Sequence, residues 1–154
     1  MKVVGLDTAV IVSGVSRRTW WRRLGDGQVQ KLPNDAKGRA VISLNDLVDA
    51  TKHPFSDEYL DLVLRADAGE AEAQNDLGQY LYELGRPEAA MYFVSAAAAA
   101  GYSDAMQWLG RAFAGGMGVE ADSKLSVMWL SRAAVAGHSI ANVQLQGLLR
   151  ANLA

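Results

Sequence analysis

The sequence predicts a mainly α-helical protein in which a small basic module precedes a stack of helical hairpins. The first observation is charge: residues 1–54 carry nine Lys/Arg against five Asp/Glu, whereas residues 55–154 carry six against twelve. The second is a proline-containing joint at residues 51–54, where the pattern changes. The third is an internal repeat after that joint. We therefore expect two domains, 1–54 and 55–154.

The composition excludes several classes of function. The chain has no cysteine, which excludes disulfides, thiolate zinc sites and cysteine nucleophiles. The two histidines, His53 and His138, lie far apart in the sequence and are poor material for a metal site. No nucleophile–base pair is evident. We therefore expect no enzymatic activity, no cofactor and no metal.

The chain also lacks the pattern of an exported or membrane-spanning protein. Its longest weakly polar stretch, 89–102, is shorter than the roughly 20 residues that cross a bilayer. Near the N-terminus, Asp7 interrupts the apolar run that a signal peptide requires. We expect a cytoplasmic protein with no membrane partner.

The first elements in order are two short helices. Residues 7–13 predict a helix, Gly14 a turn, and residues 16–24 a second helix capped by Ser16. On a helical wheel of the second helix, Trp20 and Leu24 share one side with the cap. The opposite side is rich in arginine, as major-groove insertion requires, and carries Arg17, Arg18, Trp21 and Arg22.

Two short strands and a closing helix are expected next. Residues 28–32 and 39–43 alternate as strands do, and the turn residues 33–38 between them favour a hairpin. Residues 44–50 predict the helix that closes the module. Three basic side chains of the hairpin are placed to reach a DNA backbone, namely Lys31, Lys37 and Arg39.

These elements resemble the MerR-like or excisionase-like winged helix-turn-helix family over about residues 5–52. The resemblance is carried by Gly14-Val-Ser-Arg-Arg-Thr19, by Gly25 or Gly27, and by Asn45-Asp-Leu47. It implies binding of double-stranded DNA. Arg23 departs from the family, which often has a large apolar residue there, and the family's dimerising coiled coil is absent. The expected DNA-binding residues are Ser16, Arg17, Arg18, Thr19, Trp21, Arg22, Lys31, Lys37 and Arg39.

The second domain repeats with a period in the thirties. Glycine, then alanine four residues on, then leucine eight residues on recur from Gly69, Gly101 and Gly137, at spacings of 32 and 36 residues. The four extra residues fall in the loop 115–122. Two helices per repeat at this period indicate an α-solenoid, in which each unit covers its neighbour's apolar face.

The helices of this domain follow from their caps and apolar spacing. Ser56 caps a first helix, and Asp57, Glu58 and Asp61 lie in its first turns, where the helix dipole favours acids. Further helices are expected at about 70–84, 87–100, 102–114, 122–136 and 138–151. The glycine-rich residues 115–118 lack the following Lys-Ser/Thr of a phosphate loop, so we interpret them as a repeat connector.

Residues 66–150 resemble the Sel-like repeat family, a relative of the tetratricopeptide repeat. The second unit carries the whole pattern, from Ala105 and Leu109-Gly110 through Gly116-Met-Gly-Val119 and Trp129 to Gly137-His138. The first unit lacks the long loop, and the third has only its first helix, which gives about two and a half repeats. The resemblance implies a scaffold that binds proteins or peptides.

The lone last helix is also a candidate for self-association. We expect no helix to cover its leucines, and an apolar solenoid end is a contact surface. Contact between two such ends makes a two-fold homodimer. The alternative is that the helix folds back on the preceding repeat and covers its own leucines. The expected contact residues are Leu145, Leu148, Leu149 and Leu153.

Taken together, the sequence favours a DNA-binding transcriptional regulator whose repeats dimerise it or receive a protein or ligand signal. Two alternatives stay open. One is an adaptor that binds peptides and not DNA, in which the N-terminal fold only supports the solenoid. The other is an architectural DNA-binding protein of the kind found in phages. The basic face of the second helix favours the first interpretation.

Overall fold

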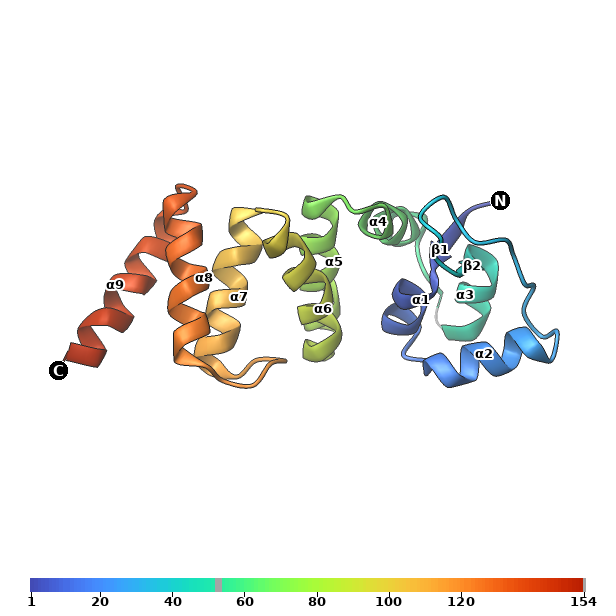
Figure 1. Cartoon of the computed structure of the whole chain (residues 1–154), viewed down its shortest axis with the longest axis horizontal. Coiled ribbons are helices and arrows are strands. Elements are labelled where there is room, and N and C mark those ends of the chain that lie inside the picture. Colours follow the sequence, from blue (N-terminus) through green and yellow to red (C-terminus); the bar gives the residue numbers. More distant parts are fainter. Residues whose placement is uncertain (52–53, 154) are drawn as a thin grey trace. The chain divides into compact units, whose positions relative to one another are not determined.

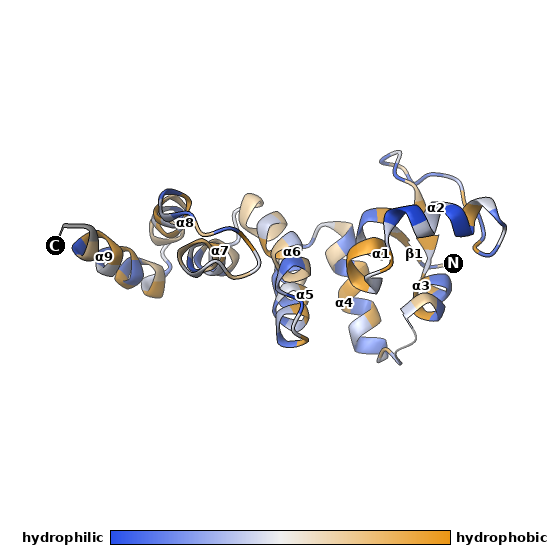
Figure 2. Cartoon of the chain, turned by 90° about the horizontal axis from the view of Figure 1, so that it is seen from below, coloured by the Kyte–Doolittle hydropathy of each residue, from blue (hydrophilic) through white to orange (hydrophobic). Residues whose placement is uncertain are grey.

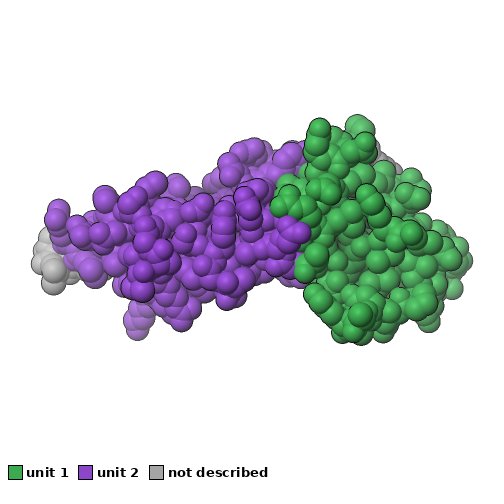
Figure 3. Space-filling view, turned by 90° about the horizontal axis from the view of Figure 1, so that it is seen from above, with its two compact units in different colours: residues 1–68 green, residues 69–154 purple. Residues whose placement is uncertain are grey.

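The computed structural model describes residues 1–51 and 54–153, with side chains described as far as Ala151. The chain forms two compact units, Met1–Ala68 and Gly69–Ala154, which Figure 3 shows in two colours. The division lies beyond the joint that we predicted, of which Lys52 and the expected linker residue His53 are outside the described residues. Helix α4 (Asp57–Ala68) therefore belongs to the first unit and not to the repeats.

The first unit contains a small sheet and four helices (Figure 1). Strand β1 (Val3–Gly5) pairs antiparallel with β2 (Val41–Ser43), with Val3 opposite Ser43. The remaining helices besides α4 are α1 (Leu6–Ser13), α2 (Arg17–Gly25) and α3 (Leu44–Thr51). In Figure 2, α1 is largely apolar and α2 largely polar.

The predicted hairpin is wrong in its first strand. The segment that follows α2 folds back onto that helix, because the amides of Gln28 and Val29 both donate to the carbonyl of Arg23. The partner of β2 is instead β1, at the start of the chain. Backbone bonds from Leu6 to Ala40 and from Leu44 to Lys2 continue this pairing at both ends.

The two predicted helices around Gly14 are confirmed. Gly14 has a φ of 68°, a left-handed conformation that favours glycine, and its amide closes α1. The Ser16 hydroxyl caps α2 by accepting a hydrogen bond from the Thr19 amide at 3.1 Å. Trp20 is 0% exposed, whereas the neighbouring Trp21 is 49% exposed. The indole of Trp20 thus fixes which face of α2 packs inward.

Helix α4 is held in the first unit by Asp67, whose carboxylate is 7% exposed. It accepts hydrogen bonds from the amide of Gly5 at 3.1 Å and from the hydroxyl of Thr8 at 2.6 Å. The guanidinium of Arg39 binds both of its oxygens, at 3.2 and 3.1 Å. One carboxylate therefore connects β1, α1 and the segment before β2 to α4, which explains why the unit extends to Ala68.

The second unit is an α-solenoid of two helical hairpins and a further helix (Figures 1 and 2). The described helices lie within a few residues of their predicted ranges. They are α5 (Ala71–Glu83), α6 (Pro87–Ala99), α7 (Ser103–Gly115), α8 (Ser123–Val135) and α9 (Ser139–Leu153). None of the described helices is long and apolar enough to cross a membrane.

Each hairpin closes over a glycine. A Cβ atom at Gly78 would lie 2.6 Å from Cγ2 of Val94, and one at Gly110 would lie 2.7 Å from Cγ of Leu130. The two helices of a hairpin can approach this closely only because the side chain is missing. The equivalent position on α9 is Gln146, which is exposed, so α9 lacks the close-approach site of α5 and α7.

Candidate functional site

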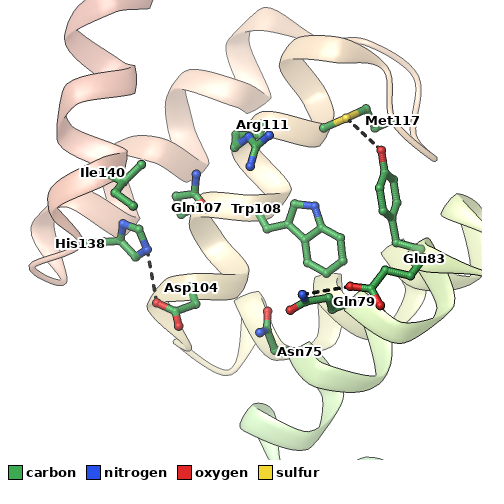
Figure 4. A pocket seen from close by; sticks show the side chains of 11 residues that line it. Asn75, Gln79, Glu83, Asp104, Gln107, Trp108, Arg111, Met117, His138 and Ile140 are labelled. Atoms are coloured by element: carbon green, nitrogen blue, oxygen red, sulfur yellow. Dashed lines mark hydrogen bonds and ion pairs between the residues drawn. The ribbon is translucent and has the colours of Figure 1, made fainter.

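A groove of about 640 Å³ runs along the second unit (Figure 4). Its walls come from α5, α7 and α9, the first helix of each repeat, and from the connector after α7. Because the groove spans three repeats, it is suited to an elongated ligand. Its lining residues are Asn75, Gln79, Tyr82, Glu83, Asp104, Gln107, Trp108, Arg111, Met117, His138 and Ile140.

The repeat explains why these side chains share one face. Asn75 and Gln107 are separated by the repeat spacing of 32 residues and occupy equivalent positions on α5 and α7. Gln79 and Arg111 are likewise equivalent, one helical turn further along. A stacked solenoid thus brings amide side chains from successive repeats into one row. This row was not predicted from the sequence, although equivalent positions of the repeats carry its signal.

Two aromatic rings form the apolar part of the groove. Tyr82 and Trp108 meet edge to face, with ring centroids 5.7 Å apart. The hydroxyl of Tyr82 donates to the sulfur of Met117 at 3.6 Å. Met117 lies in the connector between Gly116 and Gly118, both with positive φ. The glycine-rich loop therefore joins two helices and also contributes a side chain to the groove.

Most polar groups of the groove are paired within the chain. Gln107 donates to Gln144 at 2.7 Å and thereby joins α7 to α9. His138 caps α9 by accepting from the Ala141 amide through Nδ1, and its Nε2 lies 3.3 Å from Asp104. Asn75 is different, because its Oδ1 atom is buried and has no hydrogen-bond partner among the described residues.

Acidic groups gather at the end of the groove where α7 begins. Burial raises the pKa of Tyr102, and the nearby carboxylates of Asp104, Glu72 and Asp76 raise it further. At the other end, Arg111 lies beside Met117 (Figure 4). The groove therefore carries both signs of charge: Asp104 near the start of α7, and Arg111 and Glu83 near the opposite ends of α7 and α5.

The structure separates the predicted DNA-binding residues into an exposed set and a paired set. Arg18, Trp21 and Arg22 are exposed on α2, and Lys31 and Lys37 are exposed in the segment before β2. Arg17 forms an ion pair with Asp7. The hydroxyls of Ser16 and Thr19 bond to each other at 2.9 Å at the start of α2.

Arg39 has a structural place that the sequence did not indicate. Besides Asp67, it binds Asp35, to which its Nε donates at 2.7 Å. Hydrogen bonds first to Asp35 and then to Asp67 raise the pKa of Arg39. In the folded unit this guanidinium binds two carboxylates, and its assignment to a DNA contact stays a prediction.

The predicted self-association surface is partly covered within the chain. Leu145 and Leu148 pack against a buried cluster that includes Leu130 and Ala141, as in the alternative in which the helix folds back. Leu149 remains 45% exposed, and the side chain of Leu153 lies outside the described residues. Among the described side chains of the four expected contact residues, Leu149 is the most exposed, and the dimer contact stays a prediction.

Within residues 1–51 and 54–153, no group of three His, Asp or Glu side chains is placed to hold a metal ion. The candidate site is therefore the groove, which is lined by the first helices of the stacked helical hairpins. That arrangement defines a helical-repeat protein of the α-solenoid class.

Comparison with known proteins narrows this class. No protein-family model and no curated protein matches the sequence. The chain is similar to the crystal structure of a Sel1 repeat protein from Oxalobacter formigenes, with 37% identity and a TM-score of 0.52. The similarity covers 57% of this chain and 69% of that one. The chain thus belongs to the Sel1 repeat proteins, which confirms the repeats expected from the sequence.

Proposed function

We propose that the protein is an interaction scaffold that binds an extended peptide segment of a partner protein in the groove of its second unit. The observation that carries the proposal is the row of amide and aromatic side chains on two successive repeats, which His138 and Ile140 of the third repeat continue. Amides bond to main-chain groups of any sequence, and aromatic rings provide contact area. The Sel1 repeats support a helical repeat that binds protein partners.

Selection of short random peptides, displayed on phage, by the immobilised full-length chain tests this proposal. We expect the wild type to enrich peptides, and Trp108→Ala to lose that enrichment because it removes the central ring of the groove. Trp129→Ala is the matched control. Trp129 lies on α8, contacts Arg132 and does not line the groove, so that variant should retain the selected peptides. Absence of enrichment by the wild type contradicts the proposal.

DNA binding by the first unit is a second candidate, favoured by the exposed arginines of α2. Arg18 and Arg22 have no ion-pair partner among the described residues, and Trp21 lies beside them. A helix that packs through one tryptophan and presents arginine on its other face suits contact with DNA phosphates and bases. Transcriptional regulation and architectural DNA binding both remain compatible with this face.

Fluorescence anisotropy with genomic duplex fragments at two salt concentrations tests DNA binding. If the face binds DNA, log K should fall with log salt by roughly 0.9 per phosphate contacted. Arg18→Ala combined with Arg22→Ala should weaken binding, whereas Arg132→Ala on α8 should leave it unchanged. Salt-independent binding, or equal affinity of both variants, favours the interaction scaffold without DNA.

A further inference from the structure

We infer that the groove selects peptides that place a lysine or arginine side chain in the corner formed by Tyr82, Glu83 and Trp108. This inference rests on the proposed peptide binding and adds the chemistry of the partner. We call these three residues the cation corner. All three line the same groove, and Figure 4 shows Glu83 on the same side of it as the indole of Trp108.

The first support is the unpartnered acceptor on α5. The Oδ1 atom of Asn75 is buried without a hydrogen-bond partner, an arrangement that is unfavourable unless a ligand completes it. Oxygen acceptors require a donor, and a peptide offers main-chain N–H groups or the N–H groups of lysine and arginine. Turning of the Asn75 amide toward the groove would give this acceptor such a donor.

The second support is the aromatic pair. Tyr82 and Trp108 meet edge to face, and both line the groove together with Glu83. A cation placed over the face of an indole or phenol is attracted by the ring electrons. The long stems of lysine and arginine pack on such rings while the charged group reaches past them to a carboxylate, which Glu83 provides.

The third support is charge. Residues 69–154 carry eight Asp/Glu against five Lys/Arg. Two carboxylates line the groove itself, Glu83 and Asp104, and Asp104 is 60% exposed at its side chain. The opposing cation of the groove, Arg111, extends from α7 beside Met117 (Figure 4). An acidic peptide would have to approach Arg111 and avoid Glu83 and Asp104, whereas a basic one gains attraction from both.

The fourth support is the spacing of the amides, which suits an extended chain. Gln107 lines the groove and donates its NH2 group to Gln144, which leaves the carbonyl of Gln107 for a ligand. Asn75 and Gln107 therefore present amide groups at equivalent positions of two successive repeats. A main chain that lies across the helices can satisfy them while one side chain enters the cation corner.

Sequencing of the selected peptides is the first test. We expect lysine and arginine to be enriched at one position of the aligned peptides, about fivefold over the unselected library. Enrichment of aspartate or glutamate there, or of apolar residues alone, overturns the cation corner while leaving peptide binding intact. Failure of the wild type to enrich any peptide overturns the proposed function itself, so the two failures are distinguishable.

Affinity measurements on one selected peptide are the second test, with fluorescence anisotropy as the readout. Glu83→Gln should weaken binding about fivefold, whereas Glu88→Gln, an exposed acid on α6 outside the groove, should not. Replacing the peptide's arginine by neutral citrulline, or its lysine by norleucine, should weaken binding by a similar factor. With the neutral peptide, Glu83→Gln should have no further effect.

Asn75→Leu tests the acceptor separately, since leucine has a similar size and no oxygen. We expect at least about tenfold weaker binding with unchanged far-UV dichroism. If Glu83→Gln and the neutral peptide each retain full affinity, the cation corner is wrong, whatever the result for Asn75.

Discussion

Asp67 is the residue on which the first unit depends most. Its carboxylate receives a backbone amide and a hydroxyl from residues 5–8 and a guanidinium from Arg39, two segments that are distant from it in the sequence. Because the carboxylate is buried, its charge is stable there only with these donors. Arg39, the charged donor, is itself oriented by Asp35 four residues earlier. The three residues form one network.

Replacement of Arg39 tests this network. Arg39→Met keeps most of the side-chain volume but leaves the buried carboxylate of Asp67 without its cation. We expect the free energy of unfolding of the first unit to fall by about 2 kcal/mol, a value lowered for the partial exposure of Arg39. Arg22→Met on the exposed face of α2 should change it by less than about 0.5 kcal/mol. Urea unfolding followed by tryptophan fluorescence measures both, and equal effects would contradict the structural role of Arg39.

Asp35 makes the stability of the first unit depend on pH. The Arg39 amide and then its side chain, with the Lys37 amide, bond to the carboxylate and hold its pKa below the usual 3.8 despite partial desolvation. A lowered folded-state pKa gives stability that is complete above the unfolded value and is lost as pH falls through the folded value.

In Asp35→Asn this titration is absent, so the loss of stability below about pH 4 should be shallower than in the wild type. The same variant should be less stable at pH 7, because the amide cannot replace the charged acceptor. Urea midpoints at a series of pH values between neutrality and pH 3 measure the slopes. Parallel slopes would show that Asp35 does not carry the acid sensitivity.

Sequence reasoning at the residue scale found caps and helix faces but not this network. Ser16 and Trp20 were predicted correctly because their roles follow from positions within one helix. Arg39 was grouped with the DNA-contacting residues because its partner Asp67 lies 28 positions away in the sequence. The number of charged residues in a segment does not show which of them form ion pairs. The orphan acceptor of Asn75 was likewise invisible, since it depends on how neighbouring repeats stack.

At the scale of elements, each repeat depends on the close approach of its two paired helices. Gly110 on α7 lies against Leu130 on α8, and its carbonyl accepts a hydrogen bond from the buried hydroxyl of Ser126 at 2.8 Å. The repeat alignment predicted these helices because a periodic pattern is a strong local signal. Strand β1 was missed because three residues at the chain start give no pattern, and only pairing with β2 makes them a strand.

Two glycine substitutions compare a packed position with an open one. Gly110→Ala places a Cβ 2.7 Å from Cγ of Leu130 and 3.2 Å from its backbone nitrogen, so α7 and α8 must separate, at a cost of about 1–3 kcal/mol. At Gly147 on α9 nothing lies within 4 Å of the new atom. Gly147→Ala should therefore stabilise the second unit by about 0.5–1 kcal/mol through helix propensity. Thermal unfolding measures both, and effects of the same sign would contradict the close crossing.

At the scale of the whole molecule, the two units are stabilised in different ways. The first has a two-stranded sheet and short helices around a small apolar core that includes Trp20, Ile42 and Leu47, and a polar network around Asp67 in addition. The second is held by apolar side chains that are fully buried between stacked helices, among them Leu77, Leu81 and Val94. The sequence indicated two modules through charge and repeat. It placed the boundary at the proline joint because the contacts that hold α4 in the first unit, those of Asp67 among them, join residues distant in the sequence and leave no local signature.

Because each unit has its own core, we expect them to unfold as separate cooperative steps. The four tryptophans report on this separation: Trp20 and Trp21 lie in the first unit, and Trp108 and Trp129 in the second.

Asp67→Ala removes the acceptor that connects α4 to β1 and α1, whereas Asp61→Ala removes an exposed acid of the same helix. In a urea titration followed by the indole N–H signals in NMR spectra, Asp67→Ala should shift the transitions of Trp20 and Trp21 to lower urea. The transitions of Trp108 and Trp129 should stay at their wild-type midpoints, and Asp61→Ala should move neither pair. A common shift of all four signals would instead show that the chain unfolds as one body, because a cooperative unit distributes the loss of a contact over all of its residues.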